Sequence, residues 1–224
     1  MSLKLVYFNV RALAEAPQML MMCNGIDYQY EMSWDYFGDI WANAKPKLAF
    51  KQLPMLDVDG QHQICQSIAI LKLLENIAGI NIKDPIAAAK ADAILQSVQE
   101  RLAPINPTVN LAVGDDFVAK KEAMRPSLLI RFEELQNCLL ENSSKFYTDN
   151  TPRAAEFASF HYLDLSKLLD PTLIKEFPRL EKFVSDMTHL PKMAEYLESR
   201  PELIGVGEVP QMVIDGIARP TGSQ

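Results

Sequence analysis

The residues best suited to chemistry lie between Gln52 and Leu74, in the run QLPMLDVDGQHQICQSIAILKLL. Ser67 precedes an apolar helical pattern and is predicted to be the N-cap of that helix. The first N–H groups of a helix lack internal partners and lie at the positive end of its dipole, so this corner could hold a carboxylate. A cis bond between Leu53 and Pro54 would turn the Leu53 backbone outward, where an extended peptide could pair with it.

Together these features suggest a ligand that pairs along its backbone and ends in a carboxylate, as a short acidic peptide does. An ordinary hairpin and helix with a trans proline explains the same residues equally well. Cys65 adjoins the helix start, where a thiol pKa can fall, but it also alternates in a strand as a core residue would. The three histidines are widely spaced and predict no metal site: His62, His161 and His189.

The elements around these residues alternate between strand and helix over the first 78 positions. The patterns predict a strand over Leu3–Phe8, a helix over Arg11–Asn24, a strand over Asp27–Met32, a loop with a short helix over Ser33–Phe50, strands over Met55–Val58 and Gln61–Cys65, and the helix after Gln66. Asp59-Gly60 predicts the hairpin turn, because that turn needs positive φ at both positions. This order is thioredoxin-like.

The remainder of the chain has helical patterns until its tail. The predicted helices cover Pro85–Val113 with kinks at Pro104 and Pro107, Asp116–Leu140 with a bend or break at Pro126, a helix from Thr151-Pro152, Pro178–Met187 and Pro191–Leu197. The helix near Thr151 lacks a standard capping box, and Glu156 is its nearest acid. We therefore expect an α/β domain over 1–78, a linker over 79–84, an all-helical domain over 85–201 and a C-terminal extension over 202–224.

Composition limits the classes of protein that fit. The chain has 224 residues, 48% of them hydrophobic, and a net charge of −7, which argues against nucleic-acid or anionic-membrane partners. No run reaches the length of a membrane span, and the N-terminus lacks a signal-peptide pattern. The odd, widely spaced Cys23, Cys65 and Cys138 predict neither disulfides nor a zinc site. We expect a cytoplasmic protein without a bound metal.

Three runs resemble cytosolic glutathione transferases. QLPMLDVDG…ICQSIAILKLL is similar to the second half of their thioredoxin-like domain, and FPRLEKFVSDMTHLPKMAEYLESRP to their last helices. VYFNVRALAE looks most like the Sigma class, whose usual string is Tyr-Phe-Asn-x-Arg-Gly-x-Ala-Glu. The resemblance covers roughly residues 3–201. It implies an α/β thioredoxin-like N-terminal domain plus an all-α C-terminal domain, glutathione as co-substrate, an apolar electrophile as second substrate, and a homodimer.

The resemblance makes Tyr7, at the end of the first strand, the expected hydrogen-bond donor to the glutathione thiolate. A free thiol has a pKa of about 8.5, and lowering it by two units requires about 2.7 kcal/mol. A hydrogen bond to a charged group contributes about 1.5–3 kcal/mol, so one hydroxyl covers most of this requirement. Arg11 is expected to support the site.

The other expected glutathione contacts also come from the resemblance. They are Trp41 and Lys45 at the glycine carboxylate, Gln52 at the same end, Leu53 before Pro54 at the cysteinyl backbone, Gln66 and Ser67 at the γ-glutamyl carboxylate, and Glu100 reaching the partner subunit's γ-glutamyl amine. The apolar pocket is expected at the loop after the first strand, at Leu102–Asn110 and at the C-terminal end.

Two departures from the family pattern bear on turnover. Ala12 replaces the usual glycine, and Leu13 stands where some relatives have a second arginine near the thiolate. Two other functions therefore stay open. One is a glutathione-dependent isomerase like the prostaglandin D synthases of this class. The other is a non-catalytic protein like the methionine-rich S-crystallins.

The tail is the part least like the family. Relatives usually stop soon after the Ser-Arg-Pro that matches 199–201, whereas this chain continues to Gln224. Val209–Ile217 is too apolar for a solvated tail, so we expect it to dock as a lid on the apolar pocket or along the outside of the helical domain. A frayed terminus is the alternative. Gly207, Gly216 and Pro220 predict one short extended segment.

Overall fold

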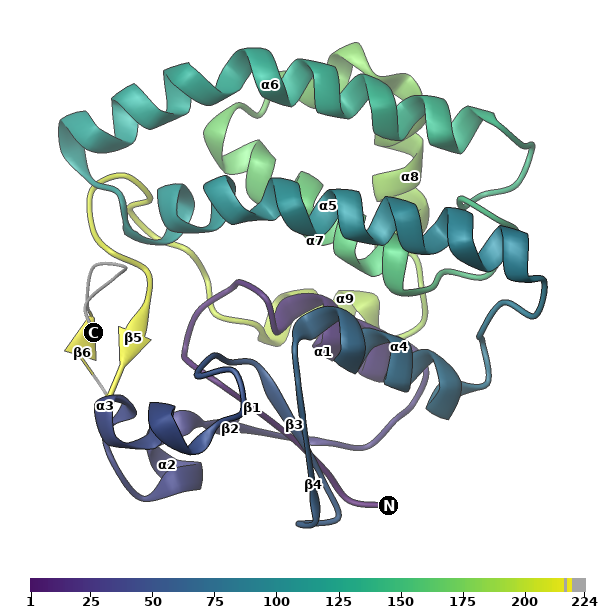
Figure 1. Cartoon of the computed structure of the whole chain (residues 1–224). Helices are drawn as coiled ribbons and strands as arrows, with labels where there is room; N and C mark the ends of the chain where they lie inside the picture. The colour runs from purple at the N-terminus through teal and green to yellow at the C-terminus, as the bar shows by residue number, and fades with distance from the viewer. Residues whose placement is uncertain (216, 219–224) are drawn as a thin grey trace.

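The chain folds into a four-stranded sheet domain and a helical domain (Figure 1). The computed structural model describes residues 1–215, 217 and 218, so Gly216 and Pro220 lie outside the described residues. This arrangement is the α/β thioredoxin-like domain followed by an all-α domain that the sequence predicted. Within the described residues, no helix is both long and apolar enough to cross a membrane.

The sheet has the strand order β2-β1-β3-β4. Its strands are β1 (Leu3–Tyr7), β2 (Gln29–Met32), β3 (Met55–Val58) and β4 (His62–Cys65). β1 runs parallel to β2 because the helix α1 (Glu15–Cys23) crosses between them, while β3 runs antiparallel to both β1 and β4. Asp59 and Gly60 lie at the centre of the turn between β3 and β4 with φ angles of 57° and 67°, which confirms the predicted hairpin turn, although Gln61 belongs to the turn and not to β4.

The remaining helices of the sheet domain are α2 (Ser33–Phe37), α3 (Trp41–Ala44), the 3-10 turn η1 (Lys45–Lys47) and α4 (Ser67–Ala78). The helical domain contains α5 (Pro85–Leu111), α6 (Gly114–Leu140), α7 (Ala154–Leu169), the 3-10 turn η2 (Leu173–Glu176), α8 (Pro178–Thr188) and α9 (Met193–Ser199). α6 continues through Pro126, so the predicted break does not occur there. α5 likewise contains Pro104 and Pro107 within one helix.

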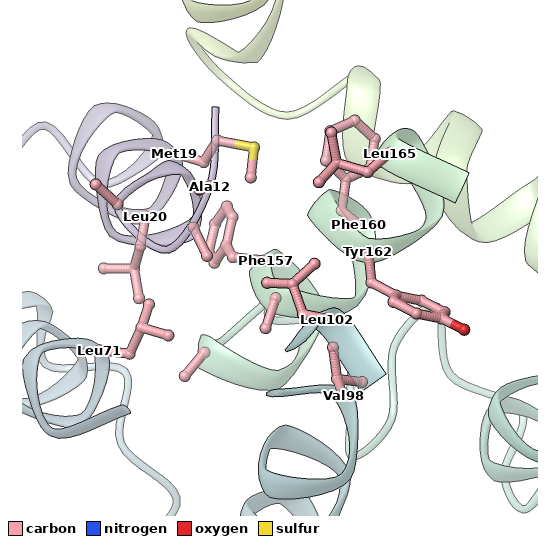
Figure 2. Packing of buried hydrophobic residues seen from close by; sticks show 14 of the residues in the cluster. Ala12, Met19, Leu20, Leu71, Val98, Leu102, Phe157, Phe160, Tyr162 and Leu165 are labelled. Atoms are coloured by element: carbon pink, nitrogen blue, oxygen red, sulfur yellow. The ribbon is translucent and has the colours of Figure 1, made fainter. Parts of the chain in front are cut away.

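Helix α7 lies at the centre of the molecule. Its sequence is apolar around most of its circumference, a pattern typical of a fully enclosed helix, and 13 of its 16 residues are buried. It packs on α5 along one side and on α1 along another. Figure 2 shows side chains of α1, α4, α5 and α7 in one cluster. Phe157 of α7 lies near Leu20 of α1, and Leu102 of α5 belongs to the same cluster. The two domains therefore share a single core.

Two helices begin later than predicted. α1 begins at Glu15, because residues 8–14 turn and carry the Arg11 guanidinium to Asp164 of α7, 2.5 Å away. α7 begins at Ala154 rather than at Thr151-Pro152, with Arg153 at the N-cap. The Glu156 carboxylate accepts from the Arg153 N–H at 2.8 Å, so it supplies the acidic half of a capping box.

The C-terminal extension docks on the body through its described residues. The Gly114 N–H donates to the Gly207 carbonyl at 2.7 Å, and the Gln211 N–H donates to the Asn110 carbonyl at 2.6 Å. The expectation of docking is therefore confirmed, and the frayed alternative is wrong for residues 207–215. The segment also differs from the single extended run we expected, because β5 (Val213–Ile214) and β6 (Ile217–Ala218) pair as a short antiparallel hairpin.

Candidate functional site

Three of the predicted site segments meet at one edge of the sheet. In the strand register, Val6 pairs with Met55, and Met55 pairs with Cys65. The residues that follow or precede these positions, Tyr7, Pro54 and Gln66, therefore lie at the same end of three adjacent strands. Backbone pairing thus brings together positions almost sixty residues apart.

Tyr7 ends β1 with only 6% of its surface exposed. Burial raises the pKa of Tyr7 to about 12, although a backbone hydrogen bond from Leu13 opposes the shift. The phenol therefore stays protonated at neutral pH and can act as a hydrogen-bond donor. Such a hydroxyl can stabilise an anion placed beside it without itself changing charge.

A cavity of about 190 Å³ lies beside Tyr7. Its walls come from the loop after β1, represented by Phe8 and Leu13, and from the last turns of α5, which contribute Asn106 and Asn110. These are two of the three regions where the apolar pocket was expected. The third wall is Met212, which lies in the C-terminal extension and therefore in the third expected region.

Leu53 and Pro54 are joined by a cis peptide bond, as predicted. Leu53 is buried and Gln52 is exposed. Neither the N–H nor the C=O of Leu53 forms a hydrogen bond with another residue in the described part of the chain. This backbone pair can therefore accept an extended ligand as an additional strand.

Ser67 differs from the prediction, because it is the first residue of α4 and not its N-cap. Gln66 holds the N-cap position with φ 75° and ψ 118°, and no side chain caps the helix. The backbone of Gln66 has a positive φ and is not helical, so the helix begins directly after it, at Ser67. Ser67 is buried, and its hydroxyl forms no hydrogen bond within residues 1–215. The hydroxyl and the first N–H groups of α4 remain together as possible donors.

Trp41 and Lys45 lie one helical turn apart, at the start of α3 and directly after it. The Trp41 ring packs edge-on against Phe8 with its centroid 5.1 Å away, so α3 is fixed next to the Tyr7 strand. Lys45 is half-buried and makes no ion pair with the described carboxylates. Its ammonium is therefore available to an anionic ligand.

Arg11 lies away from the ligand candidates, in a buried network between the domains. Its guanidinium pairs with Asp164 at 2.5 Å and approaches Glu15 at 3.5 Å, and Arg200 contacts the same two carboxylates at 2.9 Å each. Glu100 is exposed on α5 and accepts from Gln96 at 3.2 Å. Within one chain it is not part of the Tyr7 cavity.

The weaker candidates do not form a second site. Burial raises the pKa of the Cys65 thiol, which makes it a poor nucleophile at neutral pH. Burial also lowers the pKa of His161 to about 3, so this imidazole is neutral in the core. The described residues contain no group of three or more His, Cys, Asp and Glu side chains arranged to hold a metal ion.

The sequence also matches known proteins. A model of the glutathione S-transferase C-terminal domain matches residues 107–200. "Glutathione S-transferase P 10" of Caenorhabditis elegans is 30% identical over 199 residues, which covers 88% of this chain and 91% of the relative. Human "Glutathione S-transferase Mu 4" is 29% identical over 215 residues and is matched over 92% of its length.

Solved structures agree with the sequence relatives. The Pi-class glutathione S-transferase of Onchocerca volvulus superposes with a TM-score of 0.77 at 26% identity, over 89% of this chain and 94% of that one. Prostaglandin synthase D of Nilaparvata lugens has a TM-score of 0.72 at 20% identity, over 90% of this chain and 100% of that one, and shows a shared fold alone. With a 30% identical relative matched over most of its length, the chain belongs to the glutathione S-transferase family.

Proposed function

We propose that this protein is a glutathione transferase in which Tyr7 stabilises the glutathione thiolate for attack on an apolar electrophile. The observation that carries the proposal is the shared sheet edge, where a protonated tyrosine lies near an unpaired Leu53 backbone and a helix start at Ser67. A donor, a strand-pairing edge and a carboxylate site match the three chemical parts of glutathione.

In this proposal glutathione lies across the carboxyl end of β1. Its γ-glutamyl carboxylate binds at Gln66 and Ser67, and its cysteinyl backbone pairs with Leu53, which Pro54 holds in place. Its glycine end binds at Trp41, Lys45 and Gln52. The half-buried lysine without an ion-pair partner supports the last assignment, because such a charge is stabilised by an incoming carboxylate.

The thiolate then needs an electrophile, and the cavity beside Tyr7 supplies the place. The thiol gives up its proton to water, and the sulfur then bonds to the electrophilic carbon. In a substitution the bond from that carbon to the leaving group breaks and the leaving group takes the negative charge, whereas in a conjugate addition the carbon–carbon π bond breaks and the charge passes to the conjugated oxygen. Because the pKa of Tyr7 is about 12, the phenol keeps its proton while the thiol ionises. Leu13 brings no second cation to this position, so the Tyr7 hydrogen bond supplies most of the reduction in the thiol pKa in this proposal.

We further propose that the protein is a Sigma-like, cytoplasmic homodimer with a detoxifying role. The string VYFNVRALAE supports the Sigma class, while the named relatives include Pi and Mu proteins. The isomerase alternative is tested by product analysis with a prostaglandin endoperoxide. The S-crystallin-like alternative predicts that the protein is retained on immobilised glutathione but does not turn over 1-chloro-2,4-dinitrobenzene.

The decisive experiment compares Tyr7→Phe with wild type in the chlorodinitrobenzene assay. Loss of one oxyanion-type donor should lower kcat/KM by about 100-fold while glutathione affinity changes little. Tyr28→Phe is the matched control, because among the residues that the structure describes the Tyr28 hydroxyl donates to Gln18 alone, at 3.4 Å. A Tyr7→Phe variant that keeps near-wild-type kcat/KM between pH 6 and 8 rules out the assignment.

A further inference from the structure

Residues 207–215 of the extension, here called the strap, connect the two domains across the Tyr7 cavity. Figure 1 shows this yellow segment passing from the α5–α6 end of the helical domain down to α3. Two hydrogen bonds attach the strap to the helical domain: the Gly207 carbonyl accepts from Gly114 N–H at 2.7 Å, and Gln211 N–H donates to the Asn110 carbonyl at 2.6 Å. Two more attach it to the sheet domain: Val213 N–H donates to the Asn9 carbonyl at 3.2 Å, and Asp215 Oδ1 accepts from Trp41 N–H at 3.2 Å. Each bond uses a different part of the fold.

The first attachment point requires glycine. Gly207 has a φ of 85°, and a Cβ added there would lie 2.5 Å from Cδ1 of Phe117 on α6. The strap backbone therefore packs directly against an aromatic ring, an approach that a side chain would prevent. This contact fixes where the strap leaves the helical domain.

Met212 lies between two attachment points, because its neighbours Gln211 and Val213 make the bonds to Asn110 and Asn9. Its side chain lines the cavity with Tyr7 and Leu13. The cavity volume of about 190 Å³ is below the roughly 300–1,000 Å³ of ordinary ligand pockets. The strap therefore places an apolar side chain in the wall of a small pocket.

We propose that Met212 is a specificity-determining residue, which limits the size of the electrophile, and that the strap holds it in position. The inference rests on the proposed function, because it takes the cavity beside Tyr7 as the electrophile site. Met212 lies in a segment outside the sheet edge that we assign to glutathione. It should therefore change which electrophiles bind and leave glutathione binding unchanged.

The test measures binding of S-methyl-, S-hexyl- and S-octylglutathione by calorimetry to the full-length protein. Met212→Ala enlarges the cavity, so affinity for the longer chains should rise relative to S-methylglutathione, by about fourfold for each methylene newly buried. Val209→Ala is the matched control, since Val209 belongs to the strap but is 52% exposed. Free glutathione should bind all three proteins within a factor of about two.

Gly207→Ala tests the strap itself. Detaching the strap should remove Met212 from the cavity, so this variant should show the chain-length preference of Met212→Ala and faster proteolytic cleavage after residue 205 than wild type. The dye 1-anilinonaphthalene-8-sulfonate gives a readout of the cavity that does not depend on glutathione, and both variants should bind it differently from wild type.

If Met212→Ala and Val209→Ala give the same chain-length preference and dye affinity as wild type, Met212 does not set specificity, and this inference is wrong although the glutathione assignment stands. If wild type fails to bind glutathione while Met212→Ala still changes dye binding, the proposed function is wrong and the strap's control of the cavity survives. Unchanged dye binding in a protein that does not bind glutathione overturns both.

Discussion

Arg11 and Asp164 form an ion pair of 2.5 Å between the loop after β1 and helix α7. Arg200 donates to the same Asp164 oxygen and to Glu15, so two arginines and two carboxylates balance their charges between the domains. The network explains why Arg11, expected to support the glutathione site, is 7% exposed and points into the domain interface. It positions the Tyr7 loop through packing rather than by contacting a ligand.

Asp164→Asn should destabilise the protein, because it leaves two buried guanidinium groups with one carboxylate. Removing one partner of a buried pair typically costs about 3–5 kcal/mol, and the 18% exposure of the Asp164 side chain places this loss near the lower end. Urea unfolding measures the change. Asp116→Asn is the control, since its exposed pair with Lys120 on one helix should contribute only about 0.3–0.5 kcal/mol. Equal losses in the two variants would contradict the prediction.

Ser67→Ala should weaken glutathione binding with little effect on folding. The sequence predicted a capping loss of about 1 kcal/mol, but the Ser67 side chain does not cap α4. Losing a charge-assisted bond to the γ-glutamyl carboxylate should cost about 1.5–3 kcal/mol, or about 10–150-fold in Kd. Calorimetric titration checks this, with the exposed Ser127→Ala as control. Unchanged glutathione affinity would remove Ser67 from the site.

His161 should make the protein sensitive to acid. Burial lowers the His161 pKa to about 3, below the unfolded value of about 6.5. Between these values the unfolded chain binds a proton that the folded chain does not, so stability falls as pH decreases. The loss should reach about 2 kcal/mol at pH 5 relative to pH 7. In urea unfolding, His161→Gln should remove this part of the pH dependence, and the exposed His62→Gln should not. Parallel pH profiles for wild type and His161→Gln would disprove it.

A homodimer is expected, with each Glu100 in the partner's glutathione site. The exposed position of Glu100 on the long helix α5 supports this, because an isologous interface along α5 would place the residue beside the second subunit. Sedimentation should give a dimer at micromolar concentration. Glu100→Gln should then raise the glutathione Kd several-fold, while Glu195→Gln on α9 should have no effect. A monomer in sedimentation ends the proposal.

The sequence predicted the sheet domain well because its signals are local. Asp59-Gly60 specifies its own turn, and the strand patterns around it fix the register that aligns Tyr7 with Pro54 and Gln66. The start of α4 was placed one residue late, because Gln66 takes a positive φ that its residue type does not predict. The tertiary environment selects that conformation.

The start of α7 and the path of the strap depend on distant contacts. The Arg153 side chain binds the Ile80 carbonyl at 2.6 Å and Asp149 at 2.8 Å, and this holds Thr151-Pro152 outside the helix. The strap is attached to backbone groups of the body, namely the carbonyls of Asn9 and Asn110 and the N–H groups of Gly114 and Trp41. Because every residue carries such backbone groups, the sequence predicted that the apolar segment with Met212 docks but could not identify the partners that hold it.

The hydrogen bond between Glu75 of α4 and the first N–H of α7 couples the unfolding of the two domains. The Glu75 carboxylate accepts from Ala154 at 2.9 Å, so the sheet domain provides a terminal group for the central helix of the other domain. Neither half can be isolated without exposing α7 or leaving its end unsatisfied. Heat or urea should therefore melt both halves in one cooperative transition, and a chain cut in the linker between them should yield two fragments that fold only when mixed.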